Sequence, residues 1–283
     1  MKQIIVHLNE FYKVDTDSTL EILIPDDSDC KGNELGISRE VEADMMLVIP
    51  GGGYQFCSNR EADAVALAYM TEGFASAILR YSLERIFPAP HKDVMAAIDY
   101  LRTHAKGLRI RPDRISIVGF SAGGHLAGSY GYVYHDENVV KEMGLEGHDL
   151  APNIIVLGYP VITTTLSTHG GTKDRITGGD PKLLEYMSIE KHITKDYPPT
   201  FIWTTLADTI VPPISTKLMD KALTEADVRH VTIIYDKIEH GSSTCQVWVN
   251  RSKCEKEYRY LKLNSSWVEA SIEFIKGVYK EEY

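Results

Sequence analysis

The sequence lacks any long apolar run. None of its 283 residues belong to a stretch approaching the roughly 20 apolar residues that a bilayer-spanning helix needs. The first residues do not form the apolar core of a secretory signal, because Lys2 places a charge directly after Met1 and the residues around His7 are polar again. We therefore predict a cytoplasmic protein with no membrane partner.

Cysteine is scarce and irregularly placed. The four cysteines, Cys30, Cys57, Cys245 and Cys254, form no Cys-x-x-Cys pair and have no regular spacing with the ten histidines. This arrangement argues against zinc fingers and redox motifs, so we predict free thiols in a reducing compartment and no bound metal ion. For Cys57, close to the glycine loop described below, we expect a buried inert thiol rather than a second nucleophile.

Positive charge is also in deficit. The chain has 30 Lys and Arg residues against 40 Asp and Glu residues, which gives a formal net charge of −10. Such a surface repels nucleic acids and anionic membranes, so we predict neither as a partner. A neutral small molecule is the easier substrate to accommodate.

What the sequence does contain is a regular alternation of strands and helices. Apolar runs typical of buried strands occur at 45–49, 75–79, 115–118, 153–157, 201–206 and 231–235, and amphipathic patterns lie between most of them. Residues 1–43 resemble an antiparallel pair of strands, Ser58-x-x-Glu61 resembles a capping box, and Pro112-Asp113 resembles a turn. We predict one α/β domain over 1–283, with a mostly parallel twisted sheet and helices on both faces.

Two segments interrupt this alternation. Residues 160–198 are rich in turn residues and have only short helical patterns, which predicts a small cap or lid over the catalytic face. The alternative is a surface excursion without a role in the site. The second segment, 242–264, is a long loop that is rich in charge and contains Trp248, Tyr258 and Tyr260.

The feature that organises the sequence is a Gly-x-Ser-x-Gly pentapeptide centred on Ser121. The strand expected at 115–118 runs directly into it, and small residues suited to a helix start follow it. This strand, turn and helix order is that of a nucleophile elbow, in which Gly119 and Gly123 avoid collisions with neighbouring elements. The pentapeptide alone also arises by chance, but its context favours catalysis. The Ala122 N–H would then face an oxyanion formed at Ser121.

Serine catalysis needs a nucleophile, a base and an acid that orients the base. Ser121, Asp208 and His240 provide these residue types in the chain order of an α/β hydrolase, and each directly follows an expected strand. Because parallel strands end at the same edge of a sheet, we expect the three side chains to meet there.

Other titratable residues are weaker candidates. His125 precedes the acid in the sequence and is expected to pack against the sheet. Glu239 adjoins His240, and neighbouring side chains usually point apart, so Asp208 is the preferred orienting acid. Asp180 and His169 fall in the predicted cap and would at most touch the substrate.

A second loop completes the pattern. Pro50-Gly51-Gly52-Gly53-Tyr54 follows an expected central strand, and three glycines leave backbone amides able to approach a ligand closely. Read alone, it would be a flexible turn. Together with Leu79-Arg80-Tyr81, the elbow through Ala127, Asp208 and Glu239-His240-Gly241, it resembles the α/β-hydrolase esterases related to hormone-sensitive lipase.

The chain is most similar to the bacterial acetyl xylan esterase and feruloyl-esterase-like carboxylesterase branch of that group. The resemblance implies hydrolysis of short acyl esters without a cofactor, with acetylated xylo-oligosaccharides as one candidate substrate. Many relatives have His-Gly-Gly-Gly where this chain has Pro50-Gly51-Gly52-Gly53, so the histidine is absent. By position, Gly52 and Gly53 are expected to join Ala122 in an oxyanion hole. A serine peptidase or amidase, and a catalytically silent ligand-binding protein, remain alternatives.

Overall fold

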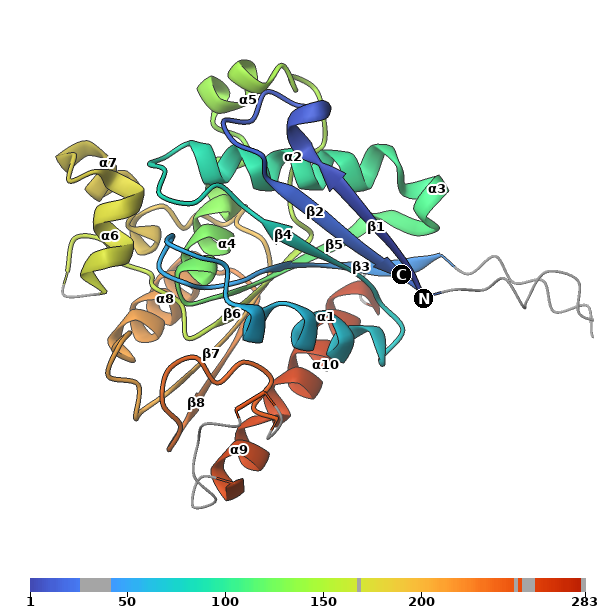
Figure 1. The fold of residues 1–283 in the computed structure, drawn as a ribbon. Coiled ribbons are helices and arrows are strands. Elements are labelled where there is room, and N and C mark those ends of the chain that lie inside the picture. Colours follow the sequence, from blue (N-terminus) through green and yellow to red (C-terminus); the bar gives the residue numbers. More distant parts are fainter. Residues whose placement is uncertain (26–41, 167–168, 247–248, 251–257, 281–283) are drawn as a thin grey trace, which may run out of the picture.

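The computed structural model describes residues 1–25, 42–166, 169–246, 249–250 and 258–280 (Figure 1). Within these residues, eight strands form one sheet: β1 (Lys2–His7), β2 (Thr19–Ile24), β3 (Ala43–Ile49), β4 (Ala75–Arg80), β5 (Ile110–Phe120), β6 (Ile154–Gly158), β7 (Thr200–Thr205) and β8 (His230–Tyr235). Cys30, Cys254 and Trp248 lie outside the described residues.

The strand order is β1-β2-β4-β3-β5-β6-β7-β8. β1 pairs antiparallel with β2, and β2 pairs antiparallel with β4, whereas the remaining neighbours are all parallel. The opening antiparallel pair and the parallel sheet are thus as predicted. β5 lies inside the parallel part, so the carboxyl ends of β3, β5, β7 and β8 point to the same edge.

Helices cover both faces of the sheet (Figure 1). On one face, α1 and α10 bury Val65, Tyr69, Ile272 and Ile275, and on the other α2, α4 and α8 bury residues such as Leu126. The helices of the described residues are α1 (Asp63–Met70), α2 (Ala89–Thr103), α3 (Ala105–Leu108), α4 (Ser121–Val133), α5 (Glu137–Met143), α6 (Gly170–Thr177), α7 (Pro181–Tyr186), α8 (Ile214–Glu225), α9 (Tyr258–Asn264) and α10 (Ser266–Lys280). Among the described residues, no helix has the length and apolarity that crossing a membrane requires.

Two local predictions were wrong. Pro112 lies inside β5 rather than in a turn: Ile110 pairs with Ala43 and Ile115 with Met45, and the register shift between them accommodates a residue that cannot donate a backbone hydrogen bond. Ser58 does not cap α1 with its side chain, and a short 3-10 turn at Asn59–Glu61 precedes that helix.

The segment 160–198 contains the two short helices α6 and α7, drawn in yellow in Figure 1. His169 caps α6 by accepting a hydrogen bond from Thr172 N, and Asp180 caps α7 by accepting one from Lys182 N. These caps satisfy backbone donors that a helix start would otherwise leave open. The segment therefore has ordered secondary structure of its own.

A buried carboxylate on α2 is hydrogen-bonded to residues of two loops, one before β2 and one after β4. Asp93 Oδ1 accepts a hydrogen bond from Ser18 Oγ at 2.7 Å, and Oδ2 accepts one from Ser82 N at 2.6 Å. Burial raises the pKa of Asp93 from 3.8 to about 6, although the hydrogen bonds from Ser82 and Ser18 act in the opposite direction. The folded state therefore binds this proton more tightly than the unfolded chain does.

Asp93 should make the protein less stable as the pH rises. Between pH 5 and 8 the folded carboxyl loses its proton while the unfolded one is already ionised, which removes on the order of 1 kcal/mol of unfolding free energy. Asp93→Asn should abolish this contribution. Urea unfolding of both proteins at pH 5 and 8 measures it, and equal pH dependence of the two proteins would contradict the prediction.

Candidate active site

Ser121 occupies a strained turn between β5 and α4. Its φ is 53°, a left-handed value that non-glycine residues rarely adopt. A Cβ on Gly119 would lie 2.3 Å from Gly123 O, and a Cβ on Gly123 would lie 2.3 Å from both Ile49 O and Pro50 O. Glycine is therefore required at both positions for the turn to pack against β3 and α4, as expected for a nucleophile elbow.

Ser121, His240 and Asp208 are brought together from three separate loops. His240 Nε2 lies 2.8 Å from Ser121 Oγ, and His240 Nδ1 lies 2.7 Å from Asp208 Oδ2. Ser121 follows β5, Asp208 follows β7 and His240 follows β8, so the meeting point is the carboxyl edge of the parallel strands. The geometry predicted from the sequence is present.

The surroundings of Asp208 define the tautomer of His240. Asp208 Oδ1 accepts hydrogen bonds from Ile210 N and Val211 N, both at 2.9 Å, and the side chain is only 1% exposed. An ionised carboxylate can only accept, so His240 Nδ1 carries the proton and donates it to Oδ2. Nε2 is then free to accept the proton of Ser121 Oγ.

The glycine loop after β3 borders the same pocket as Ser121, with Gly52 and Gly53 among the residues that line it. Gly52 and Gly53 both have positive φ, 127° and 66°, which turns the chain sharply past Ser121. Within the described part of the chain, no protein acceptor is bonded to the N–H groups of Gly52, Gly53 or Ala122. Gly51 differs, because its N–H donates to Glu61 Oε2 at 2.9 Å.

Glu61 links the glycine loop to the loop that carries His240. Its Oε1 accepts a hydrogen bond from Tyr159 OH at 2.6 Å, and the same hydroxyl accepts one from Ser243 N at 2.9 Å. The Tyr159 ring packs edge-on against the His240 ring, with 4.8 Å between centroids. Sequence reasoning missed this network, since Glu61 was taken for a capping residue and nothing in the sequence relates it to Tyr159.

With this geometry in place, similarity to known proteins decides the family. The family model described as BD-FAE matches residues 36–223, which is more than half of the chain. The chain belongs to the BD-FAE family. This is a family of α/β-hydrolase esterases, so the predicted fold and the resemblance to bacterial esterases are confirmed. The match includes Ser121 and Asp208 and ends before His240.

Two curated relatives resemble this BD-FAE chain over part of their length. Endo-1,4-beta-xylanase B of Butyrivibrio fibrisolvens is 34% identical over 211 residues, covering 71% of this chain and 33% of that protein. The acetylxylan esterase of Xylanibacter ruminicola is 29% identical over 207 residues, covering 68% of this chain and 40% of that protein. The alignments thus span only about a third to two fifths of these relatives.

Solved structures resemble the whole chain. An acetyl ester-xyloside bifunctional hydrolase from Caldicellulosiruptor lactoaceticus has a TM-score of 0.75 and 30% identity, with 96% of this chain and 97% of that one covered. The carboxylesterase Cest-2923 from Lactobacillus plantarum WCFS1 has a TM-score of 0.82 at 23% identity, with 98% and 96% covered, and shows the shared fold. The family match and these similar structures support carboxylic ester hydrolysis as the general class of activity.

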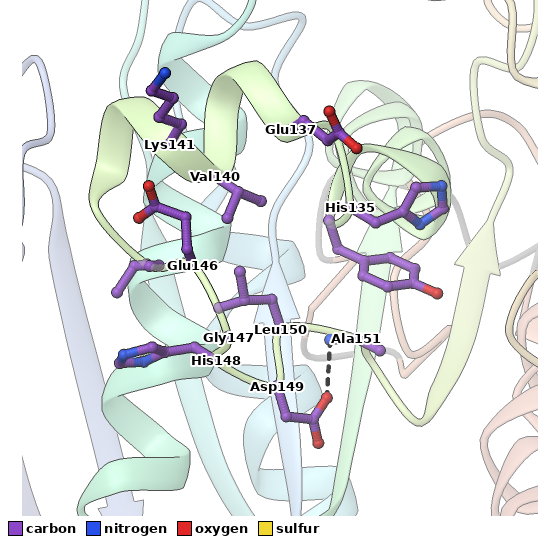
Figure 2. Close-up of a pocket in the computed structure, with 12 residues that line it drawn as sticks. His135, Glu137, Val140, Lys141, Glu146, Gly147, His148, Asp149, Leu150 and Ala151 are labelled. Atoms are coloured by element: carbon purple, nitrogen blue, oxygen red, sulfur yellow. Dashed lines mark hydrogen bonds between the residues drawn. The ribbon is translucent and has the colours of Figure 1, made fainter.

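Ser121 and His240 line a pocket of about 260 Å³ at the edge of this BD-FAE domain. Its other lining residues come from the glycine loop, α6 and the turns beside them: Gly52, Gly53, Gln55, Phe56, Ser58, Arg60, Glu61, His169, Arg175, Ile210 and Gly241. A larger pocket of about 520 Å³ lies between α5 and the 144–151 loop (Figure 2). None of the three residues of the hydrogen-bonded chain lines that larger pocket, whereas Ser121 and His240 both line the smaller one.

The other sequence candidates do not join the chain of hydrogen bonds. His125 is fully buried, with Nδ1 2.9 Å from Tyr54 OH and Nε2 2.8 Å from Met187 O, and burial lowers its pKa to about 4. It therefore stays neutral and ties α4 to the glycine loop and to the 160–198 segment. Glu239 is exposed, and the His240 nitrogen it would orient is bonded to Asp208.

Asp180 caps α7 and does not line the pocket, whereas His169 does line it while capping α6. Burial raises the pKa of the Cys57 thiol to about 11, which keeps it protonated and poorly nucleophilic near neutral pH. Among the residues that the structure describes, no three His, Cys, Asp or Glu side chains are grouped as a metal site.

Glu61 should act as a positioning residue. Glu61→Gln turns one carboxylate oxygen into an amide donor, so either Gly51 N–H or Tyr159 OH loses its acceptor in a buried place. We expect kcat to fall about 10- to 100-fold, in keeping with the cost of a small misplacement of catalytic groups, while KM changes little. Steady-state kinetics on a short acetyl ester measures both constants.

Tyr159→Phe is the matched control, because it removes the hydroxyl and leaves the Glu61 bond to Gly51 intact. Its effect should be smaller than that of Glu61→Gln, and the double variant should be little worse than the Glu61 variant alone. Full additivity of the two effects would contradict a shared network.

Proposed function

We propose that this BD-FAE protein is a serine carboxylesterase that hydrolyses short acyl esters, acetyl esters above all, through an acyl-enzyme. One observation carries the proposal: an unbroken chain of hydrogen bonds runs from buried Asp208 through His240 to Ser121 at the floor of a pocket. We assign the oxyanion hole to the N–H groups of Gly52, Gly53 and Ala122, and the presence of both glycines in the lining of this pocket supports the assignment.

The proposed mechanism begins with proton transfer from Ser121 Oγ to His240 Nε2 as Oγ attacks the ester carbonyl carbon. The carbonyl oxygen becomes an oxyanion that the N–H groups of Gly52, Gly53 and Ala122 stabilise. As the carbon–oxygen bond to the alcohol breaks, His240 returns its proton to the leaving oxygen. Water then attacks the acyl-serine with His240 again as base, which releases the carboxylic acid and restores Ser121 Oγ–H.

The substrate class is proposed from two kinds of support. One relative is named an acetylxylan esterase and one solved structure an acetyl ester-xyloside hydrolase, so acetyl groups on xylo-oligosaccharides are the substrate we propose. The pocket of about 260 Å³ suits a small acyl group. We propose 1–283 as one catalytic domain in which residues 160–198 form a cap, since His169 and Arg175 from this segment line the pocket.

Comparing three substrate types tests the proposal. The purified protein should hydrolyse p-nitrophenyl acetate and release acetate from acetylated xylo-oligosaccharide, and Ser121→Ala should do neither. Preferential cleavage of an aminoacyl p-nitroanilide would instead indicate a peptidase or amidase, because acyl transfer from amides uses the same residues. Binding of the oligosaccharide without cleavage of any substrate would indicate a silent ligand-binding protein.

A further inference from the structure

The charged side chains that line the pocket differ in whether other protein groups already bind them. Glu61 directs its two oxygens inward, to Gly51 N and Tyr159 OH. Arg175 Nε bonds to Glu84 Oε1 at 3.1 Å, and its Nη1 reaches the carbonyl oxygens of Gly53 and Gly171. Arg60 also lines the pocket, but among the described residues its guanidinium has no acidic partner.

Arg60 is held beside His240. A Cβ built on Gly241, the residue after His240, would lie 3.2 Å from Arg60 Nη2 and 3.9 Å from Cζ, so the guanidinium rests against this glycine. The Arg60 carbonyl oxygen accepts a hydrogen bond from Ser243 Oγ, which fixes its backbone to the same loop. The Arg60 side chain is exposed to solvent, and its guanidinium lies at the wall of the pocket beside Gly241.

This wall is on the side of the leaving alcohol. In the proposed mechanism His240 Nε2 returns a proton to the alcohol oxygen, so that oxygen must lie close to the imidazole when the bond breaks. Groups attached to it extend toward the residues that flank His240, Gly241 and Arg60 among them. The acyl carbonyl oxygen is directed instead toward the amides of the glycine loop.

We propose that Arg60 forms an anion subsite for esters whose alcohol part carries a carboxylate, such as an acetylated sugar acid. The inference rests on the proposed esterase function and narrows its substrate class. A guanidinium offers a planar pair of N–H donors that matches a carboxylate in two parallel hydrogen bonds. The formal net charge of −10 favoured a neutral substrate, but this local positive charge acts at shorter range than the surface average.

A matched pair of acetyl esters tests the subsite. 4-Acetoxybenzoate and 4-acetoxybenzamide have the same shape and differ in charge on the alcohol part. We expect Arg60→Gln to lower the ratio of their kcat/KM values, anionic over neutral, by about three- to tenfold, mainly through KM, as for a partly solvated charged contact. Arg60→Lys should retain part of the ratio. Lys106→Gln removes the same charge at an exposed position of α3, away from the pocket lining, and should leave the ratio unchanged.

The outcomes separate this inference from the function on which it rests. If the wild-type protein cleaves neither ester, the proposed function fails. If it cleaves both and Arg60→Gln leaves the ratio as it was, the subsite is overturned while the esterase remains. If Arg60→Gln instead slows only an ester with an anionic acyl part, 4-nitrophenyl hydrogen succinate, relative to 4-nitrophenyl butyrate, the assignment to the alcohol side is wrong.

Discussion

Replacing Ser121 by alanine is expected to lower kcat for a short acetyl ester by roughly 10⁴-fold or more, because no other hydroxyl in the described pocket is bonded to His240. His240→Ala should produce a loss of similar size, since the serine hydroxyl is a weak nucleophile without a base. Stopped-flow and steady-state assays with p-nitrophenyl acetate measure both variants.

The double variant is the informative control. When two residues act as one catalytic unit, removing either one already abolishes the contribution of both. Ser121→Ala combined with His240→Ala should therefore be about as slow as either single variant. Losses that multiply would mean that the two side chains act independently, in spite of the 2.8 Å that separates His240 Nε2 from Ser121 Oγ.

Gly52→Ala is expected to lower kcat by about 10²–10³-fold, the range typical of losing one oxyanion donor. A Cβ at Gly52 would lie 1.9 Å from Phe56 O, and the φ of 127° is one that alanine rarely adopts. The loop must therefore shift and carry its amide away from Ser121. Steady-state kinetics should show the loss in kcat with KM much less affected.

Gly53→Ala is the matched comparison for this loop. The nearest atom to a Cβ at Gly53 is His169 Cε1 at 3.6 Å, an ordinary contact, so only the strain of a φ of 66° opposes the substitution. We expect a clearly smaller loss than for Gly52→Ala. Thermal unfolding of both variants separates loss of fold from loss of catalysis, and equal kinetic effects of the two substitutions would contradict the geometric argument.

The parts of the site that were predictable from sequence are those with local signatures. The elbow at Ser121 is the direct junction of strand β5 with helix α4, and Asp208 and His240 each follow a strand that periodicity predicts. Parallel strands end at one edge of a sheet, so the order of these residues along the chain was enough to expect Ser121, Asp208 and His240 to lie within hydrogen-bonding distance of one another.

What the sequence did not reveal depends on contacts between distant residues. Glu61 and Tyr159 are 98 positions apart, and Tyr159 and Ser243 are 84 apart. The local pattern Ser58-x-x-Glu61 suits a capping box, but the buried amide of Gly51 and the Tyr159 hydroxyl bind the carboxylate instead. Tertiary hydrogen bonds outweighed a local preference, as they do wherever a buried donor needs an acceptor.

Pro112 and His125 are two further residues whose surroundings depend on contacts that the local sequence does not reveal. Proline predicts a turn locally, yet a register shift against β3 lets Pro112 lie inside β5. His125 is buried on α4, which packs against the sheet, and the sequence did not reveal that its two nitrogens contact Tyr54 OH and Met187 O, which lie far away along the chain. No sequence pattern identifies Tyr54 or Met187 as a partner of His125.

The most direct test of the account is covalent trapping with diethyl p-nitrophenyl phosphate, followed by mass spectrometry of the digested protein. An activated Ser121 should take up one diethylphosphoryl group, Ser121→Ala should take up none, and His240→Ala should react much more slowly because Oγ then lacks its base. Labelling of a different residue, or equal labelling of the Ser121→Ala variant, would contradict the assignment of Ser121 as the nucleophile.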